Sequence, residues 1–268
     1  MSASDGGEAG LPGGAAQKWS LLADDWALTW DGVAAQVYAA IADEARLGPG
    51  VRLLDVGCGA GGLLAAAQAD GVTAAGIDPA PKMVDLARER LPDCDIRLGG
   101  LPDLLWAEEE FDLVVSVNAL LFAPDVYEAL AALMRVCKTD GQVAIALWAD
   151  DVGNDLDVLE QAAAAAGGPA FGDGGPLRRD GGLAELCREA GLEDVRSRLV
   201  PTTWSAAGID DLLRAVIPGE QSGPSSSASR LPEVHRAVVD AAQPMLAEGK
   251  YTLRNSLYLC TGHVRPNT

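Results

Sequence analysis

Short apolar runs alternate with helical stretches from residue 51 to residue 148. The runs are continuous rather than alternating apolar and polar, which is typical of strands buried on both faces of a parallel sheet. They are VRLLDV (51–56), VTAAGID (72–78), CDIRLG (94–99), FDLVVSV (111–117) and QVAIALW (142–148). The pattern therefore predicts an α/β fold with a doubly wound, mostly parallel sheet.

The clearest helix lies between the fourth and fifth runs. Its apolar residues recur at helical spacing on one face: Val126, Ala129, Leu130, Leu133, Met134 and Cys137. The segment 138–141, which ends in Asp-Gly, predicts a turn before the next strand.

The N-terminal segment divides into two parts. Residues 1 to about 16 are small, polar and rich in glycine, so we expect them to be disordered. Trp19, Leu22, Trp26 and Trp30 follow at spacings of 3, 4 and 4, which predicts a helical stripe. Its indoles either pack in the core or roof a ligand pocket, so Trp26 and Trp30 are candidate substrate-pocket residues.

Beyond residue 150 the pattern is looser. We expect helices near 155–166, 182–190 and 209–217, one more helix after a linker at 219–230, and strands near 193–204 and 253–264. The interpretation is a single domain over 17–268, with a cofactor-binding core at 45–150. Residues 151–180 and 205–250 are then helical lid elements over a substrate.

Composition excludes several classes. A net charge of −19 disfavours nucleic acid, whose phosphates it would repel. No apolar run reaches the roughly 18 residues that span a bilayer, and no basic-then-apolar leader begins the chain. The five cysteines are scattered without a C-x-x-C pair, so we expect no metal site. We expect a cytoplasmic monomer or homodimer that acts on a small molecule without a membrane or nucleic-acid partner.

The chemistry is concentrated in Leu53-Leu-Asp-Val-Gly-Cys-Gly-Ala-Gly-Gly62, followed 21 residues after Gly57 by Asp78. Glycines at a strand-to-helix turn let the backbone approach a ligand, and the helix N-terminus favours electron-rich groups. An acid that closes the second strand can accept both hydroxyls of a ribose. The glycine spacing alone also fits a dinucleotide fingerprint.

Asp55 separates these two interpretations. A carboxylate two positions before the first glycine would repel a pyrophosphate. It suits a cofactor that carries a cationic amino acid, either directly or by ordering the turn.

Four segments resemble the successive motifs of class I S-adenosylmethionine-dependent methyltransferases. They are LLDVGCGAGG, GIDPAPKMVDLARERLP, FDLVVSVNALLFAPD and LMRVCKTDGQVAIALW, and the resemblance covers roughly residues 45–150. The ending YTLRNSLYLCTGHV is similar to small-molecule methyltransferases of bacterial secondary metabolism, including antibiotic biosynthesis. The resemblance implies a Rossmann-like seven-stranded sheet whose last strand is antiparallel.

The resemblance also implies roles for individual residues. Asp55, Gly57 and Gly59 would hold the methionine end of S-adenosylmethionine, with Cys58 contributing its backbone only. Asp78 would bind the ribose, and Pro79 and Met83 would pack on the adenine. The segment 116–119, with Asn118, would line the methionine side. Where the family has an acid for the adenine amino group, this chain has Gly100, so Asp103 or the Leu101 backbone would substitute.

Methyl transfer needs alignment more than a dedicated catalytic group, because the cofactor supplies the reactive centre. A general base helps with a hydroxyl or carbon acid. His235, on a helix of the lid region, is the candidate base. His263 lies near the end of the last strand, and surface placement is the interpretation that competes with a catalytic role for it. Tyr38 and Trp148 join the candidate pocket residues.

Three other functions stay open at this point. A methyltransferase-fold cyclase or pericyclase would bind the cofactor without consuming it. A nicotinamide oxidoreductase would need a proton relay such as Tyr-x-x-x-Lys, which is not found in the sequence. A non-catalytic protein would bind S-adenosylmethionine and form no product.

Overall fold

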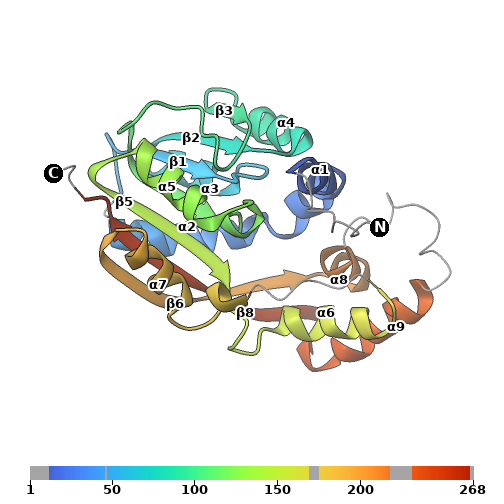
Figure 1. Cartoon of the computed structure of the whole chain (residues 1–268). Coiled ribbons are helices and arrows are strands. Elements are labelled where there is room, and N and C mark those ends of the chain that lie inside the picture. The colour runs from blue at the N-terminus through green and yellow to red at the C-terminus, as the bar shows by residue number, and fades with distance from the viewer. Residues whose placement is uncertain (1–11, 46, 169–174, 218–230, 266–268) are drawn as a thin grey trace, which may run out of the picture.

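Helices cover both faces of one central sheet (Figure 1). The computed structural model describes residues 12–45, 47–168, 175–217 and 231–265. The strands follow the order β3-β2-β1-β4-β5-β8-β6, and the short β7 pairs with β8. Their bounds are β1 Arg52–Val56, β2 Thr73–Asp78, β3 Asp95–Leu98, β4 Phe111–Val117, β5 Cys137–Trp148, β6 Glu193–Ala206, β7 Leu246–Ala247 and β8 Lys250–His263.

Strand directions confirm the predicted sheet. Strands β1 to β5 pair in parallel, and β8 runs antiparallel to both β5 and β6. The two-residue β7 adds an eighth strand within the described part of the chain. The carboxyl ends of β1, β2, β4 and β5 therefore meet at one edge, which is where ligands bind in open α/β sheets.

The helices form two layers and an additional group. Their bounds are α1 Pro12–Thr29, α2 Asp31–Ala45, α3 Gly62–Ala69, α4 Pro81–Arg90, α5 Val126–Val136, α6 Asp155–Ala165, α7 Gly182–Glu189, α8 Ile209–Val216 and α9 Leu231–Ala241. Side chains of α2, α3 and α4 share one core cluster with α6, α8 and α9, and those of α5 and α7 share a second cluster on the other face. Figure 1 shows α6, α8 and α9 grouped beyond the ends of β5 and β6.

The N-terminal prediction needs a correction. The expected disordered tail reached about residue 16, but α1 already begins at Pro12. Proline is favoured in the first turn of a helix because it lacks an N–H that would have no partner there. Downstream, Leu22 and Ala23 of the same helix are buried. Residues 1–11 lie outside the described residues, as does the linker predicted at 219–230.

The fifth strand is longer than predicted. It begins at Cys137, and the expected turn at 138–141 is an irregularity within it. The pairing with β4 shifts register between Phe111 and Leu113, and Asp140 has a φ of 62°. A local bulge of this kind lets the strand bend and continue.

Candidate active site

The glycine turn after β1 is held by the end of β2. The amides of Gly57 and Cys58 both donate to the carbonyl of Ile77, at 2.8 and 3.0 Å. The Gly59 amide donates to Asp78 Oδ2 at 2.9 Å, and Asp78 Oδ1 accepts from the Ala80 amide at 2.9 Å. Asp78 therefore joins the turn to the start of α4, while the Cys58 side chain is buried in the core.

The two leading glycines have different surroundings. Gly57 has a φ of 83°, and a Cβ added there would lie 2.2 Å from the Cβ of Ala119, so the loop after β4 is pressed against it. Gly59 has a φ of 52°, and the nearest heavy atom to an added Cβ is Met83 Sδ at 4.0 Å. One side of the turn is closed by protein, and the side at Gly59 leaves room for a ligand.

Two buried carboxyl groups flank this turn. Asp55 is 3% exposed, and no hydrogen-bond donor to its carboxyl is found among the described residues. Burial, and secondarily the neighbouring Asp78, raise the pKa of Asp55 to about 8. Burial also raises the pKa of Asp78, against the lowering effect of the amides of Ala80 and Gly59. A nearby positive charge would favour the ionised form of both groups.

Helix α1 covers the same end of the sheet. Ala23 packs in a small cluster with Ala60, Ala80 and Met83, and Trp19 and Trp26 lie against this cluster. Figure 1 shows α1 beside α4 at this edge. Met83, predicted to pack on the adenine, is buried in this cluster, whereas Pro79 is exposed.

The junction between α1 and α2 adds a contact that the sequence pattern does not reveal. A Cβ on Gly62, the first residue of α3, would lie 2.2 Å from Asp31 Oδ1. The same carboxylate forms an ion pair with Arg90 at the end of α4. Gly62 thus lets α2 approach the first turn of α3, in addition to its place in the glycine motif.

The loop after β3 contains the departure from the family pattern. Gly100 lies against Pro79, since an added Cβ would contact Pro79 at 3.5 Å. Asp103 is exposed and Leu101 is half-buried. The Gly99 amide donates to the carbonyl of Asp78 at 3.0 Å, which fixes this loop beside the end of β2.

Asn118 connects two strand ends. Its Oδ1 accepts from the Trp148 amide at 3.0 Å, and its own amide donates to the Ala146 carbonyl at 2.8 Å. The side-chain oxygen is therefore engaged in holding β4 to β5. Asn118 has a φ of 53°, a conformation that asparagine tolerates better than most residues.

Aromatic side chains form a continuous array above the ends of β4, β5 and β6, here called the indole row: Phe122, Trp19, Trp26, Trp30, Trp148 and Trp204. Ring centroids are 5.7 Å apart for Trp19 and Phe122, 5.0 Å for Trp19 and Trp26, and 6.0 Å for Trp26 and Trp30. Trp30 lies 5.9 Å from Trp148 and stacks on Trp204 at 5.3 Å. Three predicted pocket residues thus come together.

Trp204 and Phe122 belong to the row and were not predicted. Each stood in the sequence as a single aromatic residue near the end of an element, without helical spacing to connect it with α1. The Trp30 indole also donates to the Ala215 carbonyl of α8 at 3.3 Å.

Other predicted residues lie elsewhere. The Tyr38 hydroxyl donates to Asp70 at 2.9 Å, beyond the end of α3 and at the opposite edge of the sheet, so its assignment to the pocket was wrong. His263 pairs with Gln142 near the start of β5 and is exposed, as the surface interpretation had it. His235 lies on α9, which packs against α6 and α8 rather than on the ends of β1 and β2.

A carboxyl of α6 was also missed. Burial, and secondarily Asp157 on the same helix, raise the pKa of Glu160 to about 7. Nearby, Arg178 forms an ion pair with Asp150 and donates to the Trp148 carbonyl at 2.9 Å. Glu160 can therefore gain or lose a proton near neutral pH close to one end of the indole row.

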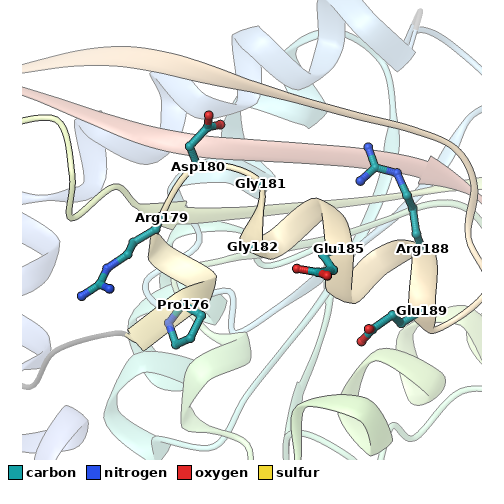
Figure 2. A pocket seen from close by; sticks show the side chains of 8 residues that line it. All are labelled: Pro176, Arg179, Asp180, Gly181, Gly182, Glu185, Arg188 and Glu189. Carbon is teal, nitrogen blue, oxygen red and sulfur yellow. The ribbon is translucent and has the colours of Figure 1, made fainter.

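A surface pocket of about 610 Å³ lies away from these residues, around the first turns of α7. Figure 2 shows Glu185, Arg188 and Glu189 on that helix and Arg179 and Asp180 on the segment before it. Its lining carries both acidic and basic side chains.

Among the described residues, no cluster of three or more His, Cys, Asp or Glu side chains is arranged to hold a metal ion. No helix there is both long and apolar enough to cross a membrane.

Comparison with known proteins agrees with this geometry. Residues 54–145 match the model of a methyltransferase domain family. The match agrees with the resemblance found in the sequence: over these residues, about a third of the chain, the protein is similar to class I S-adenosylmethionine-dependent methyltransferases. The antiparallel last strand of the sheet is the one that the resemblance implied.

Individual relatives are more distant. The chain is 34% identical over 172 residues to nocamycin O-methyltransferase of Saccharothrix syringae, covering 55% of this chain and 61% of that one. It is 32% identical over 134 residues to an uncharacterized protein of Mycobacterium tuberculosis, covering 48% of each. The chain thus spans about half the length of the first curated relatives it matches.

Solved structures show the same fold. The YcgJ protein of Bacillus subtilis superposes with a TM-score of 0.58 at 17% identity, covering 86% of this chain and 98% of that chain. The [4+2]-cyclase SpnF gives 0.57 at 21% identity, covering 89% and 84%. One architecture therefore serves proteins of different activity.

Proposed function

We propose that the protein binds S-adenosylmethionine at the glycine turn and transfers its methyl group to a small molecule, a natural-product intermediate. The observation that carries this is the pair of buried carboxyls, Asp55 and Asp78, on either side of a turn whose open side is at Gly59. The similarity to nocamycin O-methyltransferase supports the substrate class.

The residues present fit this cofactor. Asp55 has no hydrogen-bond donor among the described residues, and a cationic amino acid would compensate its burial. Asp78 keeps lone pairs on both oxygens for ribose hydroxyls beside its two amide bonds. In this proposal Met83 and the Leu101 loop would contact the adenine.

The chain's own contribution is orientation and exclusion of water. When bound, the cofactor supplies an electrophilic methyl group for in-line displacement. Helix α1 closes over the turn, and the indole row presents flat apolar surfaces next to it, so water is displaced from the acceptor. For an acceptor that must lose a proton, Glu160 replaces His235 as the candidate base.

A cyclase or pericyclase that binds the cofactor without consuming it is the second candidate. It is favoured by one observation, the placement of His235 and His263 away from the ends of β1 and β2. Release of S-adenosylhomocysteine with an acceptor distinguishes methyl transfer from this alternative. The lid assignment of 151–180 and 205–250 and a cytoplasmic location are part of the same proposal.

Calorimetric titration with S-adenosylmethionine tests the cofactor site. Asp78→Ala removes two acceptors of charged hydrogen bonds worth about 1.5–3 kcal/mol each, so we expect affinity to fall roughly 100-fold or more. Asp85→Ala, which removes an exposed carboxylate on α4, is the matched control and should bind like the native protein. Equal binding by Asp78→Ala and native protein, or no binding by the native protein, would refute the proposal.

A further inference from the structure

Asn255 of β8 carries a buried donor that the protein does not use. The residue is 3% exposed, and its Oδ1 accepts from the Leu156 amide of α6 at 3.0 Å. Its Nδ2 is buried and has no hydrogen-bond partner among the described residues. The amide cannot be turned over, because the Leu156 N–H requires the oxygen on its side.

Strand register places Asn255 beside the indole row. Strand β8 lies between β5 and β6, with Leu257 opposite Trp148 and Leu253 opposite Trp204. Side chains on one face of a strand recur every second residue, so Asn255 lies on that face between the two tryptophans. Trp30 contacts both of these indoles.

The three indoles form a corner suited to a flat molecule. Trp30 and Trp204 are inclined by 26°, whereas Trp30 and Trp148 are inclined by 75°. A planar ring can stack on one wall and meet the other edge-on, which are the two favoured arrangements of aromatic pairs. Trp148 and Trp204 are both only half-buried, so part of each indole at this corner is open to solvent, whereas Trp30 is 4% exposed.

An unpaired buried N–H costs about 1–3 kcal/mol, and native proteins contain few of them. Contact with an indole face would recover only a small part of this cost. An oxygen atom of a ligand would satisfy the donor fully, whereas an ammonium group, which carries only donors, would not.

We propose that Asn255 Nδ2 and the corner formed by Trp30, Trp148 and Trp204 bind a planar aromatic methyl acceptor through a carbonyl or phenolic oxygen. That the bound molecule accepts a methyl group rests on the proposed function. The binding site itself does not require methyl transfer. It defines the substrate class as aromatic and oxygenated, and it makes Asn255 the residue that positions the ring.

The test uses two probes that differ in one oxygen, 1-tetralone and tetralin. Each is titrated into the native protein by ligand-observed NMR without S-adenosylmethionine. We expect 1-tetralone to bind about 10-fold more tightly, the effect of one hydrogen bond to an otherwise unpaired buried donor. Equal affinities, or no binding of either probe, would overturn the proposal.

Two asparagine variants separate positioning from folding. Asn255→Ala should reduce the affinity ratio to about 1. Asn154→Ala is the matched control: Asn154 is also 3% exposed and beside the start of α6, but its Nδ2 donates to Ala149 and its Oδ1 accepts from Ser256. It should keep the ratio of the native protein. If Asn255→Ala does not fold, the comparison of the two probes on the native protein still tests the proposal. A ratio retained in Asn255→Ala would show that Asn255 only supports α6. Because no cofactor is present, failure here is distinguishable from failure of cofactor binding.

Discussion

The two ends of the proposed site are built in different ways. The cofactor end uses a contiguous stretch, from Asp55 to Met83, and relies on backbone amides and two carboxyls. The acceptor end brings together side chains from α1, β5, β6 and β8, segments far apart in the sequence, and relies on indole faces. The difference teaches that a short motif can define a cofactor end, whereas an acceptor end depends on how distant elements meet.

This contrast extends to tolerance of substitution. Backbone at the glycine turn is constrained by close contacts at Gly57 and Gly62, where even a methyl group would clash. The indole row consists of side-chain contacts at 5.0–6.0 Å between centroids, which a different ring could partly replace. We therefore expect the largest effects of substitution at the cofactor end.

The glycine turn should give the largest loss of stability. Gly57→Ala adds a Cβ at a positive φ and only 2.2 Å from Ala119, so the free energy of unfolding should fall by about 3–4 kcal/mol. Gly50→Ala is the control: its φ is 94° with nothing within 4 Å, and it should cost about 1 kcal/mol. Urea unfolding measures both. Equal losses would show that the contact with Ala119 is not decisive, and adding Ala119→Gly to Gly57→Ala should recover part of the difference.

Asp55 should make stability depend on pH. Its pKa is about 8 in the folded protein and about 3.9 when unfolded, so between pH 4 and 8 the folded state holds a proton that the unfolded state releases. The free energy of unfolding should then fall by up to about 1.4 kcal/mol per pH unit as pH rises through this window. Asp55→Asn removes this contribution.

Between pH 6 and pH 8, the free energy of unfolding measured in urea should fall by about 2 kcal/mol more for the native protein than for Asp55→Asn. Asp85→Asn, which changes an exposed carboxylate of α4, should behave like the native protein. Parallel pH profiles for native protein and Asp55→Asn would contradict an unpaired buried carboxyl.

The indole row should give the smallest effect. Trp30→Phe keeps an aromatic ring and removes the hydrogen bond to Ala215, so stability should fall by about 1 kcal/mol and 1-tetralone should bind several-fold more weakly. Trp106→Phe also removes an indole hydrogen bond, to Asp95, but lies outside the row. Trp106→Phe should lose a similar amount of stability in thermal unfolding, and it should bind 1-tetralone as tightly as the native protein does. If both variants weaken probe binding alike, the row is not the binding surface.

Much of the fold was predictable because its signals are local. Continuous apolar runs gave the strands from β1 to β5, and helical spacing gave α5, although the start of β5 at Cys137 was missed. Asp78 and the glycines were predicted as a site because they lie within one motif.

The rest depends on contacts that no local pattern contains. Tyr38 lies on the same helical pattern as buried residues, and only the structure shows that its hydroxyl reaches Asp70. Trp204 and Asn255 approach Trp30 because β8 enters between β5 and β6, a matter of long-range pairing. His235 was chosen for its chemistry, whereas its position follows from the packing of α9 on α6 and α8.

The central position of β8 has a consequence for how the chain acquires its shape during synthesis. Strands β1 to β5 all lie before residue 150, so they can pair with one another as soon as that part of the chain has left the ribosome. Strand β6 pairs with β8 in the sheet, so it has no partner until residues 250–263 have also left the ribosome. Until then, the open edge of β5 and the whole of β6 expose backbone groups to other chains. The cofactor half can therefore form first, the aromatic half is completed only with the last strand, and in that interval the unpaired edges are most open to aggregation.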